Sequence, residues 1–481
     1  MKNKTKILHP ATMFLLLMLT VVFLSWILDV YELKVTHPGT GEVIKVQSLL
    51  SPEGIRWWLR HVVSNFTDFA PLGMVMVTLL GIGVAEHAGL INVCIRQGLK
   101  DRMNKSFVMI LVILLGLVSN VIGDAGYIIL IPIAAILFHS VGLHPIAGII
   151  TAYVSVSCGF SANLFLNTLD PLLARYTQEA AGLHQSNVGA FSNYYFMSIS
   201  TFIIGGVIYW LTKKYLSPLL GAYEGKSSFN GYKQLSGKER RALYLSLLVG
   251  GLYVLIILFA TFSPWGILRG ITGGITRSPF IAGTIFLLSF GIGLMGLVYG
   301  FASGRYRSDS DVIKGLSQPM SLLSVYFVII FFASQMFACI EYSHLDKCFA
   351  VFSANLFSSL RVTGLSALLL FILFTAVINL IITSSTSKWV LISFIFVPMF
   401  AAMGITPEWT QCAYRIGDST TNAISPFLFY LPLVLSYMLQ YDKQSSYVSL
   451  LKYTWRYSFC IFLAWILLFV VWYLLKFPLG M

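Results

Sequence analysis

Two apolar stretches of the sequence, at residues 159–171 and 413–426, contain charged, hydroxyl and amide side chains that could bind a small ion or an anionic substrate. These side chains include Asn163, Asp170, Arg415, Asp418, Ser419 and Asn422. Carboxylate, hydroxyl and amide oxygens are hard ligands that suit Na⁺, and an aspartate within a membrane also suits proton transfer. An arginine presents a planar fork that can hold a substrate carboxylate. The residue types therefore indicate a site for a cation together with a carboxylate.

Arg415 and Asp418 are three residues apart, so on a helix they could neutralise each other without binding anything. That interpretation leaves Asp170 unexplained, and a charged residue at the centre of a membrane costs about 2.5–3.5 kcal/mol. We therefore favour a functional site in which Arg415 balances Asp418 and holds the substrate. Asp170 has no basic residue within four positions, its nearest being Arg175. We expect Asp170 to bind or release the driving cation, Na⁺ or H⁺, with no other cofactor.

The composition identifies the medium in which these residues lie. The chain has 481 residues, of which 57% are hydrophobic and 11% charged, and its mean hydropathy is +0.80. Soluble domains carry about 25% charged residues, so only a multi-pass membrane protein fits this composition. Basic residues cluster at the N-terminus and in the loops at 96–105 and 213–241. This pattern follows the positive-inside rule and places these segments in the cytoplasm.

The same charge pattern accounts for the net charge of +13, so we expect no nucleic-acid partner. The expected location is the lipid bilayer of the bacterial inner membrane, with the N-terminus in the cytoplasm and, after an odd number of crossings, the C-terminus outside. We find no spacing of a nucleophile and a base, or of metal ligands, that indicates an enzyme.

A membrane crossing takes about 20 apolar residues. Nine stretches are long enough, near 11–31, 67–90, 145–168, 194–212, 243–262, 282–302, 319–341, 408–437 and 457–475. Two further apolar regions, 107–139 and 364–403, are interrupted by polar tips, and we interpret them as re-entrant hairpins that enter from opposite sides. Pairs of kinked ordinary helices are the alternative. Irregular backbone at membrane depth is tolerated only inside protein or beside water, so the tips at Asn120, Asp124 and Ser385 should line a cavity.

The sequence also repeats itself weakly. The matching pairs are Asn120 with Asn379 at an offset of 259, GLHP at 142–145 with GITP at 404–407 at an offset of 262, and SANLF at 161–165 with TTNAI at 420–424 at an offset of 259. Repeated interrupted helices point to the binding site of a secondary transporter. We expect an all-α membrane protein with about nine transmembrane helices, two re-entrant hairpins and an inverted-topology repeat.

This organisation predicts five segments. They are scaffold helices at 1–106, a first inverted repeat at 107–212, a basic cytoplasmic loop at 213–242, further scaffold helices at 243–363 and a second inverted repeat at 364–481.

Several segments resemble one family of transporters. They are FAPLGMVMVTLLGIGVAEHAGL (69–90), GDAGYIILIPIAAILF (123–138), GFSANLFLNTLDPLLA (159–174), SKWVLISFIFVPMF (387–400) and AYRIGDSTTNAISPF (413–427). They are similar to the AbgT family and follow its order over nearly the whole chain. The second tip, TSSTSK at 383–388, is richer in hydroxyl groups than the usual version in this family.

The resemblance implies a homodimer of subunits with nine transmembrane helices and two hairpins, driven by Na⁺ or H⁺. It also implies a link to p-aminobenzoyl-glutamate uptake and to sulfonamide antimetabolite export. The family site residues that match here are Asp170, Asn379, Trp389, Pro407, Arg415 and Asp418.

Combining the residues with the resemblance gives the expected site. The substrate-binding residues are Arg415, Trp389, Asn379, Asp418 and Pro407. The cation-coupling residues are Asp170, Asp418, Asn163, Asn422 and Ser419, with Na⁺ possible at Asp170, Asp418 and Asn379. Trp389 could stack an aromatic ring or serve as an interfacial anchor, and Lys388 beside it could simply extend to the membrane surface.

The leading hypothesis is a cation-coupled secondary transporter of p-aminobenzoyl-glutamate-like folate catabolites, or an exporter of sulfonamide-type antimetabolites, working by alternating access. The alternative is a Na⁺- or H⁺-coupled carrier of simple dicarboxylates. Arg415 fits either substrate, whereas Trp389 favours an aromatic amide. A channel fits the asymmetric site and the paired hairpins less well.

Overall fold

A computed structural model describes residues 8–36, 41–98, 104–122, 125–167, 169–182, 188–221, 223, 235–270, 278–321, 323–358 and 362–481. Within these ranges the regular secondary structure is helical except for one short antiparallel pair of strands, β1 (Lys34–Thr36) and β2 (Val43–Lys45), in which Lys34 lies opposite Lys45. Asp124, at the expected tip of the first hairpin, lies outside the described residues.

Seven helical segments among the described residues are long and apolar enough to span a membrane. Six of them are built on α1 (Pro10–Val30), α9 (Tyr194–Leu211), α11 (Gly237–Phe262), α13 (Thr284–Ser303), α15 (Ser324–Ser343) and α21 (Tyr447–Leu474). The seventh combines α2 (Pro52–Thr67) with α3 (Ala70–Ala88). These segments correspond to seven of the nine expected crossings.

The other two expected crossings are broken helices. The first consists of α7 (Pro145–Ser157) and α8 (Asp170–Ala181), and the second of α19 (Pro407–Thr420) and α20 (Leu431–Tyr441). A proline lies at the first or second position of all four helices. Because proline has no N–H and clashes with the preceding turn, it is favoured at the start of a helix and disfavoured in its interior. The local sequence thus explains why these segments restart.

Two pairs of shorter helices occupy the regions of the expected hairpins. The first pair is α5 (Lys105–Ser119) and α6 (Ile131–Ser140), joined through η1 (Asn120–Ile122) and the π-helix η2 (Gly126–Leu130). The second pair is α17 (Gly364–Asn379) and α18 (Ser385–Ala401). At 1.5 Å per residue, α5 and α18 are about 22 and 26 Å long, short of a hydrocarbon core of about 30 Å.

Small residues allow each hairpin to pack closely on its broken helix. A Cβ added to Gly116 of α5 would lie 2.4 Å from the Cβ of Ser155 in α7. In the second unit, a Cβ on Gly417 of α19 would lie 2.6 Å from the Cβ of Thr375 in α17. Thr375 is 259 residues after Gly116, so the contact recurs at the offset found in the sequence. The order hairpin, broken helix, long helix therefore occurs twice with related packing.

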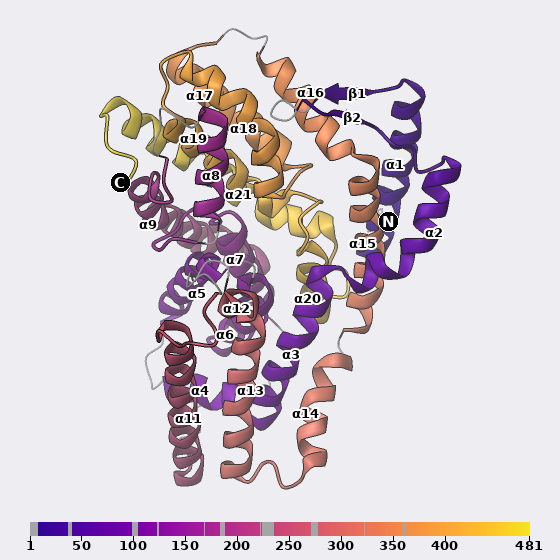
Figure 1. Ribbon diagram of the computed structural model, residues 1–481. Coiled ribbons are helices and arrows are strands. Elements are labelled where there is room, and N and C mark those ends of the chain that lie inside the picture. Colours follow the sequence, from indigo (N-terminus) through magenta and orange to yellow (C-terminus); the bar gives the residue numbers. More distant parts are fainter. Residues whose placement is uncertain are drawn as a thin grey trace, which may run out of the picture.

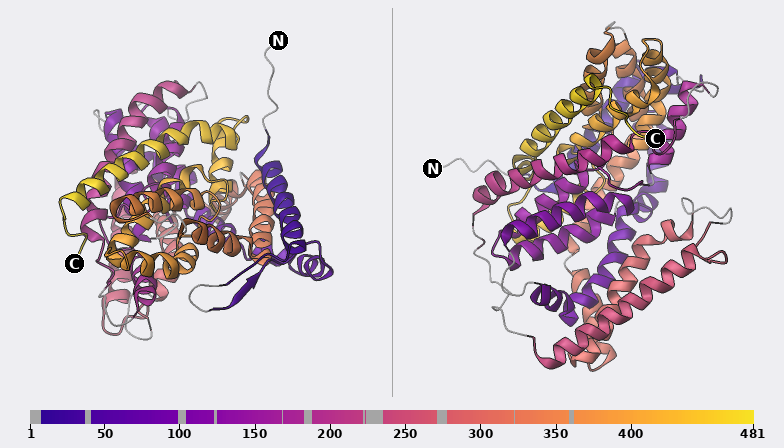
Figure 2. Two further views of the ribbon diagram at one scale, coloured as in Figure 1. Left: turned by 90° about the horizontal axis from the view of Figure 1, so that it is seen from above. Right: turned by 90° about the vertical axis from the view of Figure 1, so that its left-hand side faces the viewer.

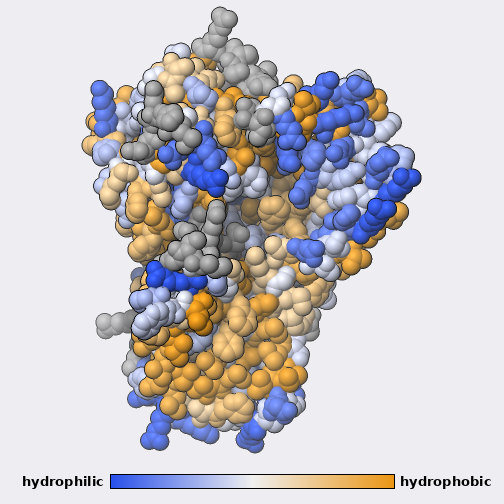
Figure 3. Space-filling model, in the orientation of Figure 1, coloured by the Kyte–Doolittle hydropathy of each residue, from blue (hydrophilic) through white to orange (hydrophobic). Residues whose placement is uncertain are grey.

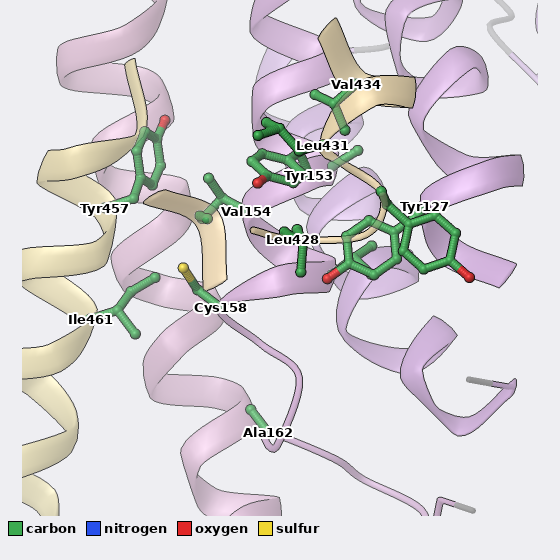
Figure 4. Close-up of a cluster of buried hydrophobic side chains, with 14 of the residues drawn as sticks. Tyr127, Tyr153, Val154, Cys158, Ala162, Leu428, Leu431, Val434, Tyr457 and Ile461 are labelled. Carbon is green, nitrogen blue, oxygen red and sulfur yellow. The ribbon is translucent and has the colours of Figure 1, made fainter. Parts of the chain in front are cut away.

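The broken helices form the centre of the molecule. Every residue of α7 is buried, as is α19 from Thr410 to Thr420. Figure 4 shows Tyr153 and Val154 of α7 beside Leu428 and Leu431 of the second unit.

Of the remaining long helices, α9 and α21 pack on each other and on the broken helices, and the others lie beside this centre in two groups (Figure 1). One group comprises α3, α11, α13 and α14 (Asp309–Ser321), and the other comprises α1, α2 and α15. Figure 2 shows α1 and α15 at one side of the packed core. A broad apolar surface covers the lower part of the molecule in Figure 3, as expected of helices that face lipid. Short helices complete the chain: α4 (Leu90–Gly98), α10 (Ser217–Leu220), α12 (Pro279–Ala282), α16 (Leu345–Ser358), η3 (Thr212–Leu216) and η4 (Asn422–Ile424).

Candidate functional site

Two buried ion pairs meet on α19. Arg415 Nη2 lies 2.6 Å from Asp170 Oδ1 at the start of α8, and both side chains are 4% exposed. Lys388 Nζ of α18 lies 2.7 Å from Asp418 Oδ1, with exposures of 0% and 1%. The expectation that Arg415 balances Asp418 along one helix is wrong, because Arg415 pairs instead with Asp170, which has no basic residue within four positions in the sequence. Residues three apart differ by about 60° around a helix, so each can meet a different neighbour.

Lys388 is the largest departure from expectation, because it does not extend to the membrane surface. Its ammonium donates to Asp418 Oδ1, to Asn379 Oδ1 at 2.5 Å and to the carbonyl oxygen of Ile382 at 3.1 Å. An ammonium has three N–H donors, and here all three have an acceptor. The hydroxyl of Tyr414 donates to the Ser385 carbonyl at 2.5 Å and lies 3.3 Å from Asp418 Oδ1.

Asparagine side chains connect this ion pair to both broken helices. Asn379 Nδ2 donates to Thr421 Oγ1 at 3.1 Å and to Asn422 Oδ1 at 2.8 Å. Asn422 Nδ2 donates to the carbonyl oxygen of Ser157 at the end of α7, at 3.2 Å. In the first unit, Asn120 Nδ2 donates to the Gly159 carbonyl at 3.3 Å. Asn120 and Asn379 thus each link a hairpin to a broken helix, as their matching positions would suggest.

The carboxylate of Asp170 is held by the start of α8 as well as by Arg415. Its Oδ2 accepts the backbone N–H of Asn167 at 2.7 Å, and Asn167 Oδ1 accepts the N–H groups of Leu169 and Asp170 at 2.9 Å each. A carboxylate in the first turn of a helix is also stabilised by the helix dipole. These contacts orient the carboxylate so that its other oxygen, Oδ1, faces Arg415.

Trp389 is fully buried rather than interfacial, so the anchor interpretation is wrong. Its Nε1 donates to Thr177 Oγ1 of α8 at 3.0 Å, and its ring lies 4.3 Å from that of Tyr414, with an interplanar angle of 35°. Gln411 Nε2 also donates to Thr177 Oγ1, at 2.8 Å, and its Oε1 accepts from Asn193 Nδ2. In this conformation Tyr414 occupies the ring contact that a substrate was expected to make.

The other expected site residues lie at a distance from the two ion pairs, or contact them only through a backbone carbonyl or a shared cavity. Pro407 begins α19, about 12 Å along the helix axis from Arg415. Ser419 donates to the Arg415 carbonyl at 2.9 Å, a bond within the helix. Asn163, Asp170 and Arg415 line a cavity of about 10 Å³, which is roughly the space of one water molecule.

Four residues of this network were not among the site residues predicted from the sequence: Lys388, Gln411, Tyr414 and Thr177. One signal was present: Gln411, Arg415 and Asp418 are spaced i, i+4 and i+7, which places three polar side chains on one face of the helix. Nothing in the local sequence indicates that Thr177 would meet that face.

A large cavity of about 860 Å³, here called the tip cavity, lies beside the tip of the second hairpin. Its hairpin wall is formed by Ile381, Ile382, Thr383, Ser384, Thr386 and Ser387, and its opposite walls include Phe337, Phe427, Phe429, Lys45, Lys347, Glu341 and Asp346. Burial raises the pKa of the Asp346 carboxyl. Ser385 itself is buried against Tyr414, while its neighbours face the cavity.

Ile382 joins the tip cavity to the ion pairs. It lines the cavity, and its carbonyl accepts from Lys388. The backbone of the hairpin tip therefore lies between a cavity of substrate size and a buried charged network.

Comparison with known proteins identifies the family to which this arrangement belongs. The model of the AbgT transporter family matches residues 2–481. The chain belongs to the AbgT family of transporters. Family membership confirms the resemblance seen in the sequence, and the helices and their breaks confirm the expected all-α membrane fold.

Individual members of the AbgT family extend this finding. The chain is 30% identical to the p-aminobenzoyl-glutamate transport protein of Escherichia coli strain K12, over 99% of this chain and 94% of that protein. The solved YdaH transporter of Alcanivorax borkumensis is 36% identical, with a TM-score of 0.55, over 98% of this chain and 100% of that one. Neisseria gonorrhoeae MtrF, described as illuminating a class of antimetabolite efflux pumps, is 35% identical with a TM-score of 0.54, over 98% and 96% of the two chains.

Proposed function

We propose that this chain is a cation-coupled secondary transporter of p-aminobenzoyl-glutamate-like folate catabolites, able also to carry sulfonamide-type antimetabolites, and that it works by alternating access. The names of its relatives in Escherichia coli and Neisseria gonorrhoeae support this substrate class. We propose further that it acts as a homodimer in the bacterial inner membrane, coupled to Na⁺ or H⁺, with the N-terminus in the cytoplasm and the C-terminus outside.

The observation that supports this function best is the tip cavity and its position beside the ion pairs. Its aromatic wall includes Phe337 and Phe429, whose rings lie 4.4 Å apart. Aromatic side chains suit the ring of an aminobenzoyl group. Lys45 and Lys347 on the same cavity offer positive charge for carboxylates, within a lining that also contains the carboxylates of Glu42, Glu341 and Asp346. A carrier of simple dicarboxylates would use the lysines but would gain little from the aromatic wall.

The pair of Arg415 with Asp170 supplies a mechanism for holding a carboxylate. The guanidinium has an unused donor, because Arg415 Nε has no hydrogen-bond partner within the described structure while Nη2 lies 2.6 Å from Asp170 Oδ1. A substrate carboxylate could accept from both Nε and Nη2, which is the stronger bidentate arrangement. In this proposal Asp170 occupies the place of the substrate carboxylate in the unloaded carrier, and the substrate displaces it.

Movement of the second hairpin would connect the two regions. The tip contacts α19 through Lys388 and Ser385, and α18 contacts α8 through Trp389. A displaced tip would open the path from the tip cavity toward Arg415. Closing it again would enclose the substrate, as alternating access requires.

Reconstitution into proteoliposomes tests this function. Purified protein should concentrate p-aminobenzoyl-glutamate when a Na⁺ or pH gradient is imposed, and should show counterflow when both gradients are absent. A channel would show neither accumulation nor counterflow. Excess succinate should compete poorly; full competition by succinate would instead favour the dicarboxylate carrier.

A further inference from the structure

We propose that Asn193 is a specificity-determining residue of the substrate site, and that its amide oxygen accepts the N–H group next to the substrate carboxylate. The substrate class would then be N-acyl α-amino acids, in which an amide N–H is attached to the carbon that carries the carboxylate. The inference rests on the proposed function and deepens it, because it assigns the group that lies beside the carboxylate held by Arg415.

The small cavity beside the pair of Arg415 with Asp170 is lined by side chains that keep unused hydrogen-bonding atoms. Asn163 Oδ1, Asn193 Oδ1 and Arg415 Nε have no hydrogen-bond partner within the described part of the chain, and all three residues line the cavity. Their exposures are 3%, 1% and 3%. Buried polar atoms are costly unless they are satisfied. The cavity therefore offers two acceptors and one donor to a ligand.

The orientation of the Asn193 amide follows from a chain of hydrogen bonds that begins at Trp389. The indole Nε1 can only donate, and it donates to Thr177 Oγ1 at 3.0 Å. The Thr177 hydroxyl donates to the Leu173 carbonyl at 2.7 Å, so Gln411 must also donate to Thr177 Oγ1, through Nε2 at 2.8 Å. Gln411 Oε1 then accepts from Asn193 Nδ2. The nitrogen of the Asn193 amide is thus engaged, and its oxygen remains available to a ligand.

The size of the cavity suits a single N–H group. Its volume is about 10 Å³, which is room for one atom of the size of a water oxygen or an amide nitrogen. In the proposed function Arg415 Nε donates to the substrate carboxylate. A nitrogen on the carbon that carries this carboxylate would lie in the cavity, where its hydrogen can reach Asn193 Oδ1.

The same arrangement disfavours other occupants. The charge of Asp170 is already balanced by Arg415 at 2.6 Å, so the cavity offers no net negative charge to a free cation. A simple dicarboxylate would leave Asn193 Oδ1 unpaired, and an ester would set a second oxygen against it. A site built to accept a hydrogen bond rejects analogues that lack the donor, because its own buried group is then left unpaired. Selectivity for an amide therefore follows from Asn193 whichever acyl group the substrate carries.

The test compares two ligands that differ in one group. Isothermal titration of the purified full-length protein in detergent gives the Kd of p-aminobenzoyl-glutamate and of its ester analogue, in which an oxygen replaces the amide N–H. Wild-type protein should bind the amide at least about tenfold more tightly than the ester. Equal Kd values for the two compounds would overturn the inference and leave the proposed function intact.

A variant assigns this selectivity to Asn193. Asn193→Leu removes the acceptor while keeping a side chain of similar size, so the ratio of the two Kd values should fall to about twofold or less. Asn65→Leu is the matched control, because Asn65 Nδ2 also donates to a glutamine, Gln335 Oε1 at 3.2 Å, within the scaffold group that contains α2 and α15. The control should keep the wild-type ratio. A ratio that is the same in Asn193→Leu as in wild type would exclude the proposed role of Asn193.

A third ligand distinguishes the two N–H donors of the substrate. Benzoyl-glutamate lacks the ring amino group but keeps the amide N–H, so Asn193→Leu should weaken its binding as much as that of p-aminobenzoyl-glutamate. No effect on benzoyl-glutamate would show that Asn193 contacts the ring amino group, and the inference would be wrong. Asn193→Ala replaces Asn193→Leu if the latter does not fold, and the wild-type ratio of amide to ester decides if neither folds. Absence of binding by all three compounds would contradict the proposed function, and the inference with it.

Discussion

At the residue scale, the site consists of four buried charges that balance in pairs across helices. Removing one partner of a buried pair leaves an uncompensated charge and costs about 3–5 kcal/mol, whereas replacing both with uncharged residues can be nearly neutral. Each pair includes one residue of α19. The pair with Asp170 holds α19 to α8, and the pair with Lys388 holds α19 to α18. Loss of one charge and loss of a whole pair should therefore have different consequences.

Lys388→Met should lower the free energy of unfolding by about 3–5 kcal/mol in Na⁺-free buffer, because Asp418 is left buried and unpaired. Adding Asp418→Asn should restore most of that loss. Denaturation in detergent measures both effects. Arg175→Met is the control, because the Arg175–Glu179 pair at 2.7 Å is exposed and surface pairs contribute about 0–1 kcal/mol. No recovery in the double variant would show that Lys388 does not compensate Asp418.

Arg415→Lys should weaken the binding of p-aminobenzoyl-glutamate by about tenfold or more, although the charge is kept. A lysine cannot reproduce the bidentate fork that a carboxylate uses. Isothermal titration with the purified protein measures the change. Equal Kd values for the variant and wild type would remove Arg415 from the substrate site.

The sequence was sufficient to find Asp170, Arg415 and Asp418 but not to pair them. A charged residue within an apolar stretch is visible without a structure, because burial of an unpaired charge is costly. The partners come from distant parts of the chain: Asp170 is 245 residues before Arg415, and Lys388 is 30 before Asp418. Helical spacing identifies only neighbours on the same helix. It therefore suggested Asp418 as the partner of Arg415, whereas the partner is Asp170.

At the element scale, the site depends on helices that stop inside the protein. The repeat offset and the polar tips indicated both hairpins and both broken helices, because proline and polar residues interrupt an otherwise continuous apolar pattern. The short strands β1 and β2 were not predicted, and α16 was not expected as a separate helix. Lys45 of β2 and Asp346 and Lys347 of α16 line the tip cavity, so its polar wall could not be derived from the membrane pattern.

Gly417→Ala should destabilise the protein by about 1–3 kcal/mol and reduce uptake, because the added methyl group overpacks the contact between α19 and α17. The new Cβ would lie 2.5 Å from the carbonyl oxygen of Ile372. Gly206→Ala on α9 is the matched control, because a Cβ there meets nothing within 4 Å. Thermal unfolding and uptake are compared for the two variants; equal effects would contradict the role of close packing at Gly417.

At the scale of the whole molecule, two groups of scaffold helices lie beside a pair of broken helices. An odd number of crossings would place the two termini on opposite sides of the membrane. The basic loops indicate which side is the cytoplasm. The proposed exchange of a cation and a carboxylate would need both the scaffold and the hairpins, because in an alternating-access carrier their relative movement exposes the site to each side in turn.

Membrane-impermeant thiol labelling should find opposite sides for two positions. Cys94 is exposed in the native protein and lies next to the basic 96–105 loop, so it should react from the cytoplasm. The thiol in Met481→Cys, at a residue that is 73% exposed, should react from outside. Right-side-out and inverted vesicles provide the comparison. Labelling of both thiols from one side would contradict an odd number of crossings.

The most direct test of the account concerns Asp170, which is proposed to stand where the substrate carboxylate binds. Asp170→Asn removes the internal competitor and leaves Arg415 buried without its partner when the carrier is empty. Equilibrium binding and gradient-driven uptake of p-aminobenzoyl-glutamate are measured on the same preparation. We expect an unchanged or lower Kd together with loss of accumulation against the substrate gradient. A substantially higher Kd, or accumulation that continues at the wild-type level, would contradict it.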